Sequence, residues 1–162
     1  MVQSVHSRPH SQVPSDQMDN YWIKALGGGP RIGRIPDDWR DVDDALFERA
    51  VTFAQRSSIE PGDKIVLYAA GWGAFFALGT AQSYPYPTEG EDPWRWHVDI
   101  ELERSVPFVH HGLPLRVLNV DGRDLRVAMR RRSHIRLSGA EYEAAAEGLA
   151  EKQRILEQRS GR

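Results

Sequence analysis

The clearest chemical signal in the chain is a cluster of arginines between Arg123 and Arg136. This stretch of fourteen residues holds six arginines and a single acid, Asp124. Guanidinium groups placed so close together repel one another unless an anion lies among them, and phosphate accepts paired hydrogen bonds from them. The cluster would otherwise be a solvated surface. We interpret it as a nucleic-acid contact in which arginines hold phosphates and release counterions; the residues assigned to this role are Arg130, Arg131 and Arg132.

Five tryptophans supply a second kind of chemistry. A nucleobase that stacks on an indole gains ~1–3 kcal/mol, and a cationic or methylated base gains further from the ring face. Trp72 lies at an expected hairpin tip, and Trp94 and Trp96 follow a proline-rich loop. Taken singly, each indole is better explained as a cover for the core or a plug at a sheet end. Because indoles in loops are harder to explain in that way, we expect at least one to line a pocket.

A glycine-rich segment, Gly27 to Pro36, carries two further arginines. It can be interpreted as a loop whose backbone N–H groups hold a phosphate, or as a flexible connection. Its spacing matches neither a dinucleotide fingerprint nor a phosphate-loop motif. Arg31 and Arg34 are therefore candidate phosphate contacts without a motif to support them.

The residue types argue against the common catalytic and metal sites. The chain has no cysteine, which removes disulfides, thiolate ligands and cysteine nucleophiles, and it has no G-x-S-x-G elbow. His110 and His111 are adjacent, so on a strand they would point to opposite faces. We therefore predict no catalytic residue, no metal and no cofactor. One alternative stays open: Lys24 with Asp99 or Glu101 as the convergent set of a small hydrolase or nuclease.

Length and composition predict one soluble domain. The chain has 162 residues, 40% of them hydrophobic, and a net charge of −2, so any nucleic-acid contact must come from a local patch. No apolar run approaches the ~20 residues of a membrane helix, and the N-terminus lacks the apolar core of a signal peptide. We expect a cytoplasmic protein with a disordered arm over 1–19, a domain over 20–150 and a polar tail over 151–162. The oligomeric state stays open.

The elements that must position these residues are arranged around a hairpin. Two apolar runs, Ile65–Ala70 and Ala74–Ala81, flank Gly71-Trp72-Gly73 and predict two strands that are buried on both faces, at the middle of a sheet. Gly79 lies inside the second run, where glycine typically marks a bulge. A third possibility for the exposed aromatic residues is a protein-interaction surface.

Other segments give weaker element predictions. The first strand is expected over 20–26, with Trp22 and Lys24 on one face, and further strands over 94–103 and 134–137. A helical stripe begins near Trp39 and continues to Phe53 through Val42, Leu46 and Ala50. Residues 115–120 suit either a strand or one helical turn. Ser138 with Glu141 forms a capping box that opens a closing helix, expected to fray from residue 151.

The order of these motifs resembles the EVE domain of the PUA-like superfamily, a relative of YTH domains. The matching pieces are the Y-W-I-K strand, P-G-D-K-I-V-L-Y entering a hairpin that ends F-F-A-L-G-T-A, D-P-W-x-W-H-V-D-I, and S-H-I-R-L-S-x-x-E-Y. They cover Asn20 to Leu149. The resemblance implies an α+β fold, a small mixed β-barrel of five to six strands flanked by helices. It also implies binding of nucleic acid, RNA or DNA, with a modified base held in an aromatic pocket.

The resemblance also places the pocket. It implies that the base lies between the exit of the first strand, the start of the following helix and the loop after the hairpin. The residues implied for the base pocket are Lys24, Ala25, Leu26, Trp39, Trp72, Tyr84, Trp94 and Trp96. Related domains usually follow the first-strand lysine with a small polar residue, whereas this chain has Ala25-Leu26 and three glycines. Backbone groups would then replace that side chain in bonding the base edge. ASCH-type hydrolases of similar fold are the alternative class.

Overall fold

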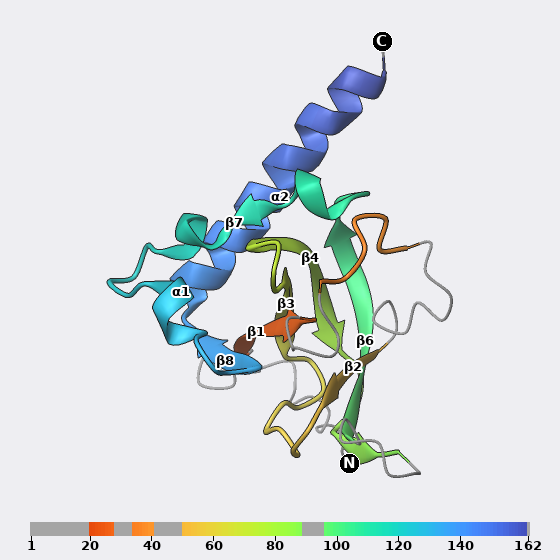
Figure 1. Ribbon diagram of the computed structural model, residues 1–162, viewed down its shortest axis with the longest axis vertical. Helices are drawn as coiled ribbons and strands as arrows, with labels where there is room; N and C mark the ends of the chain where they lie inside the picture. Colours follow the sequence, from red (N-terminus) through yellow and green to blue (C-terminus); the bar gives the residue numbers. More distant parts are fainter. Residues whose placement is uncertain (1–19, 28–33, 41–49, 89–95, 162) are drawn as a thin grey trace, which may run out of the picture.

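The computed structural model describes residues 20–27, 34–40, 50–88 and 96–161, and the expected arm over 1–19 lies outside them. The described part contains eight strands and two α-helices (Figure 1). The strands are β1 (Tyr21–Leu26), β2 (Ala50–Phe53), β3 (Lys64–Ala69), β4 (Ala74–Ala81), β5 (Tyr86–Pro87), β6 (Trp96–Ser105), β7 (Leu113–Pro114) and β8 (His134–Leu137). The helices are α1 (Leu125–Ala128) and α2 (Gly139–Ser160). Neither described helix is long and apolar enough to cross a membrane.

The strands form one mixed sheet in the order β2-β6-β4-β3-β1-β8, with β5 added to β6 and β7 added to β4. The pair β1–β3 is parallel, and the other pairs are antiparallel. The sheet curls into a half-barrel, and the N-terminal part of α2 packs across it (Figure 1). The α+β class expected from the sequence is therefore confirmed, and β2 and β8 are the two edges of the main sheet.

The central hairpin is confirmed as β3 and β4, which lie in the middle of the sheet order. The register of β4 against β6 shifts between Leu78 and Gly79, so the expected irregularity is present. A Cβ atom on Gly79 would lie 3.1 Å from the carbonyl oxygen of Glu101. That approach is closer than most side chains allow, which explains why a residue without a side chain stands at this point.

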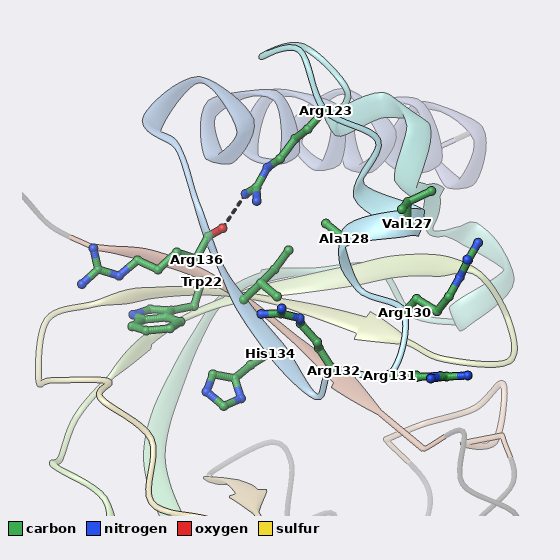
Figure 2. A pocket seen from close by; sticks show the side chains of 10 residues that line it. Trp22, Arg123, Val127, Ala128, Arg130, Arg131, Arg132, His134 and Arg136 are labelled. Atoms are coloured by element: carbon green, nitrogen blue, oxygen red, sulfur yellow. Dashed lines mark hydrogen bonds between the residues drawn. The ribbon is translucent and has the colours of Figure 1, made fainter.

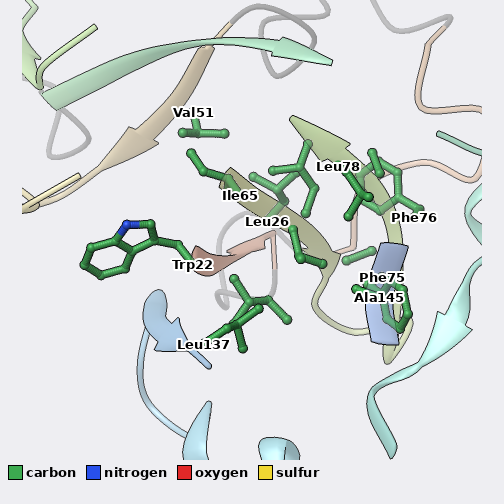
Figure 3. Close-up of a cluster of buried hydrophobic side chains, with 14 of the residues drawn as sticks. Trp22, Leu26, Val51, Ile65, Phe75, Phe76, Leu78, Leu137 and Ala145 are labelled. Atoms are coloured by element: carbon green, nitrogen blue, oxygen red, sulfur yellow. The ribbon is translucent and has the colours of Figure 1, made fainter. Parts of the chain in front are cut away.

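Strand β1 separates two layers of core. Tyr21 stacks on Tyr142 of α2 with ring centroids 4.7 Å apart, so one face of β1 lies under the helix. Alternation places Trp22, Lys24 and Leu26 on the other face, inside the half-barrel. Figure 3 shows this interior, where side chains of β1, β2 and β3 approach one another. The lysine thus belongs to a largely apolar interior, in which the buried Asp63 accepts a hydrogen bond from Trp22.

The expectation of a helical stripe that continues to Phe53 is wrong for Ala50–Phe53, which form strand β2. Val42 and Leu46, the start of the helical stripe, lie outside the described residues. The strand pairs antiparallel with β6, which places Val51 opposite Val98. Val51 and Phe53 are also two residues apart, so these apolar positions fit the period of a strand as well as that of a helix. The β-branched and aromatic residues favour the strand once β6 offers an unpaired edge.

The closing helix is longer than expected. The capping box of Ser138 and Glu141 is present as predicted. The helix does not fray at residue 151 but continues as far as Ser160. Two contacts hold this last part: Leu156 packs partly buried against the core, and Gln153 Nε2 donates a hydrogen bond to the carbonyl of Ser105. Of the two possibilities for 115–120, the structure has a helical turn, a 3₁₀ turn over Leu115–Leu118.

Candidate nucleic-acid interface

The two edge strands of the half-barrel approach each other through aromatic rings. The rings of Phe53 on β2 and His134 on β8 meet edge-on, with centroids 4.9 Å apart. Lys24 Nζ lies 4.6 Å from the centroid of the Phe53 ring. We call these three residues the seam. Phe53 and Lys24 are almost fully buried and His134 is half-buried, so the imidazole is the part of the seam that a planar ligand meets first.

Burial sets the charges at the seam. Lys24 is 2% exposed, and burial lowers its pKa to about 8. The ammonium is therefore mostly protonated at pH 7. Burial, followed by the charge of Lys24, lowers the pKa of His134, so its imidazole is neutral at the same pH. Its Nδ1 lies 2.9 Å from Ser133 Oγ, which leaves Nε2 for another partner.

Trp96 extends the seam. It stands opposite Phe53 in the β2–β6 pair, so both side chains project from the same face of the sheet. Its indole is half-buried, and the Arg56 guanidinium carbon lies 5.9 Å from its centroid. The inner face of the half-barrel thus brings one predicted tryptophan and the predicted lysine to the same phenylalanine.

A cleft of about 910 Å³ opens beside the seam (Figure 2). We call it the arginine cleft. Its lining consists of Trp22, Arg123, Val127, Ala128, Arg130, Arg131, Arg132, His134, Ile135 and Arg136. The lining contains no acidic residue, and of its guanidinium groups only that of Arg123 has an ion-pair partner among the described residues, Glu141. His134 belongs to both the cleft and the seam, and this shared residue makes them neighbours.

The cleft is formed by a short turn between α1 and β8. Asp124 caps α1 by accepting a hydrogen bond from the backbone N–H of Arg126. The chain then reverses through Arg131, whose φ of 64° lies in the left-handed region, which costs a non-glycine residue energy. Figure 2 shows Arg132 turned toward His134, whereas Arg130 and Arg131 point away from it. The turn therefore spreads its guanidinium groups along the cleft.

Arg123 has a different role from its neighbours. Its Nε and Nη2 donate to the two carboxylate oxygens of Glu141, each at 2.8 Å. Nη2 also donates to the carbonyl of Arg136, drawn as a dashed line in Figure 2. Glu141 is buried; although burial works to raise its pKa, the bonds from Arg123 and Ser138 hold it below the usual range. This ion pair ties β8 to the start of α2.

Arg34 lies at the tip of the central hairpin. Its guanidinium carbon is 4.2 Å from the centroid of the Trp72 ring, and Trp72 Nε1 donates to the carbonyl of Ile35 at 2.7 Å. A Cβ atom on Gly71 would come within 2.6 Å of the Arg34 side chain. The tip glycine thus makes room for Arg34, which stacks on Trp72 rather than on the seam.

The structure brings some of the predicted residues together and separates others. Lys24 and Trp96 meet at Phe53, and Ala25 and Leu26 follow on the same strand. Trp39 is fully buried, and its Nε1 donates to the carbonyl of Val106, so it is a core residue. Tyr84 is 60% exposed. Arg31 and Trp94 lie outside the described residues.

The possible hydrolase set is not assembled. Lys24 faces the inside of the half-barrel, whereas Asp99 and Glu101 alternate with the buried Val98 and Ile100 and so face outward. Asp99 accepts a hydrogen bond from the hydroxyl of Tyr86. Among the described residues, no three His, Cys, Asp or Glu side chains are grouped so that they could hold a metal ion.

Several cleft and seam residues escaped prediction. Trp22 shares the face of Lys24, which was the available signal. Phe53 is predicted in a helix, and His134 in a short strand without a role. Arg136 belongs to the predicted arginine cluster but not to the three residues assigned to phosphates. Their proximity arises from pairings between distant segments, β8 with β1 and β2 with β6.

No protein-family profile matches the sequence, and no curated protein matches it. Solved structures do match. Rpa0253 of Rhodopseudomonas palustris has a TM-score of 0.54 at 14% identity over 81% of this chain and 93% of its own. A hypothetical protein from Leishmania major has a TM-score of 0.55 at 18% identity, over 85% of this chain and 98% of its own. Human THYN1, solved in complex with DNA containing 5-methylcytosine, has a TM-score of 0.52 at 11% identity, over 83% and 98%. The chain therefore shares the fold of these three structures.

Proposed function

We propose that this chain is a nucleic-acid-binding domain that captures one base at the seam and holds the adjoining phosphates in the arginine cleft. The observation that carries the proposal is the cleft without acids, which opens at His134 and so adjoins the seam. The solved complex of THYN1 with 5-methylcytosine DNA supports it, because that protein shares the fold. The partner is DNA or RNA, and the captured base carries a modification.

The energetics of such capture are reasonable. Extruding a base from a duplex costs a few kcal/mol, and a single strand or a modified, weakly paired base costs less. Stacking on the half-buried rings of Trp96 and His134 returns ~1–3 kcal/mol per base. Lys24 donates a charge-assisted hydrogen bond to an acceptor on the base edge, and an ammonium in an apolar interior makes such a bond strong. The arginines supply the affinity that does not depend on sequence.

Binding of short labelled strands tests the proposal. We expect a single-stranded 9-mer with a central 5-methylcytosine to bind at low salt, with weaker binding by the His134→Ala variant. His97→Ala is the matched control, because His97 lies on β6 opposite Thr52 and packs beside Tyr86 on the outer face. Fluorescence anisotropy of the strand measures both affinities.

Two results would contradict the proposal. One is the absence of binding by strands carrying varied modified bases at low salt. The other is an equal loss of strand affinity in His134→Ala and His97→Ala, which would mean that the strand does not bind at the seam. Affinity for a protein partner that does not change with salt would instead point to an interaction module.

A further inference from the structure

Every tryptophan in the described part of the chain carries an arginine against its ring. The pairs, with the distance from guanidinium carbon to ring centroid, are Arg136 on Trp22 at 5.0 Å, Arg34 on Trp72 at 4.2 Å, Arg40 on Trp39 at 4.8 Å and Arg56 on Trp96 at 5.9 Å. Because these indoles are already covered on one side, a base that approaches from that side meets a flat guanidinium group.

One of these pairs belongs to the arginine cleft. Trp22 and Arg136 both line it and stand opposite each other in the β1–β8 pair, so their side chains share a face (Figure 2). Trp22 is fixed, because it is 5% exposed and its Nε1 donates to Asp63 Oδ2 at 2.9 Å. The arginine therefore rests on a rigid support.

The guanidinium group of Arg136 is available to a ligand. Within the described residues, its side chain makes no hydrogen bond or ion pair, in contrast to Arg123, which Glu141 holds by two bonds. Arg136 is exposed, so its guanidinium group beside Trp22 is accessible from solvent. A group that is positioned by an indole and left unbonded is suited to stacking.

We propose that Arg136 is a stacking platform for a second, unmodified nucleobase that flanks the captured base. This inference depends on the proposed function, because the strand must already lie in the cleft. Guanidinium planes stack on nucleobases, and Arg136 would then be sandwiched between the base and Trp22. Lysine carries the same charge but has no plane, so the role of Arg136 differs from phosphate binding in a measurable way.

A double-mutant cycle between protein and strand tests the platform. The strand is the 9-mer with a central 5-methylcytosine, in which a tetrahydrofuran abasic residue replaces one nucleotide at a time. We expect one position next to the centre where base removal weakens wild-type binding about tenfold. In Arg136→Lys the same removal should cost less than about twofold, because the base has no plane to stack on.

Arg130→Lys is the matched control, since Arg130 lines the same cleft and rests on no indole in the described residues. It should keep the wild-type response to the abasic scan. If the scan gives the same profile in wild type and Arg136→Lys, the platform is wrong while the proposed function stands. If the 9-mer binds none of the proteins at low salt, the proposed function fails and takes this inference with it.

Discussion

Lys24 carries an ammonium group into an apolar interior, and that placement is costly to the folded state. Burial lowers the pKa of Lys24 to about 8, in the direction expected when the charged form is disfavoured. A residue retained there in spite of it is a candidate for function, because burial strengthens any bond that it donates to a ligand. The stability of the fold and the binding of a base therefore make opposite demands on this position.

We predict that Lys24→Met stabilises the protein at pH 7, by at most about 3 kcal/mol because its contacts are lost as well, and weakens base capture. The folded-state pKa lies below the unfolded value, so wild-type stability rises as the pH increases from about 8 towards 10.5. The advantage of the variant should therefore be full below pH 8 and shrink above it. Urea unfolding at pH 7 and pH 10 measures this. A variant less stable than wild type at pH 7 would contradict it.

Arg131 gives a second prediction of the same kind. Its φ of 64° strains a residue with a side chain, and glycine adopts this conformation freely. We expect Arg131→Gly to leave stability unchanged or raise it by up to ~1 kcal/mol, while strand binding weakens. Arg130→Gly is the control and should destabilise. Thermal unfolding separates the two, and an equal loss of stability in both variants would show that the turn carries no strain.

At the scale of the residue, the sequence shows which side chains could act, but not which of them lie close together in space. The arginine turn is evident as a run of one residue type, and Lys24 is expected at the pocket from the resemblance of the first strand. Phe53 and His134 are ordinary strand residues until β2 and β8 approach each other as sheet edges. The sequence of neither strand contains that approach, because it follows from the curl of the whole sheet.

At the scale of the element, the start of α2 controls the position of β8. Glu141 closes the capping box with Ser138 and also receives Arg123, which in turn donates to the carbonyl of Arg136. One buried carboxylate thus connects the helix, the segment before α1 and the strand that carries His134. The geometry of the cleft depends on this connection.

We predict that Glu141→Gln destabilises the fold by roughly 2–3 kcal/mol and increases amide exchange in β8, because a bidentate pair and a cap weaken together. The pKa of Glu141 is lowered in the folded state, so this contribution is fully present above the usual glutamate range. It is lost as the pH falls through the lowered value. The two proteins should therefore converge in stability in acid. If the amides of β8 exchange at the same rate in wild type and Glu141→Gln at pH 7, Glu141 does not hold β8 in place.

The elements also show why β2 is difficult to predict. Ala50, Val51 and Phe53 fit a helical stripe and an alternating strand equally well. The choice depends on β6, whose hydrogen-bonding edge is available to them. The hairpin of β3 and β4 has no such ambiguity, because its glycine-bounded apolar runs are too short for helices and contain their own turn.

At the scale of the whole molecule, positive charge is concentrated in one place although the net charge is slightly negative. The net charge is −2, yet the arginine cleft contains no acid. A second cleft of about 350 Å³ also contains two arginines, Arg116 and Arg126, together with Asp124 and Tyr68. The two clefts allow the local field to be tested against the overall charge.

We predict that Arg130→Gln combined with Arg132→Gln weakens strand binding and reduces the dependence of log K on log salt by about 1.4, since each lost phosphate contact on a single strand removes ~0.7. Preference for a modified base should persist, because the seam is intact. Arg116→Gln with Arg126→Gln removes the same two charges, so either pair takes the net charge from −2 to −4. Anisotropy titrations at several salt concentrations compare them. Equal losses of salt dependence in both pairs would mean that strands respond to total charge, and the arginine cleft would no longer explain binding.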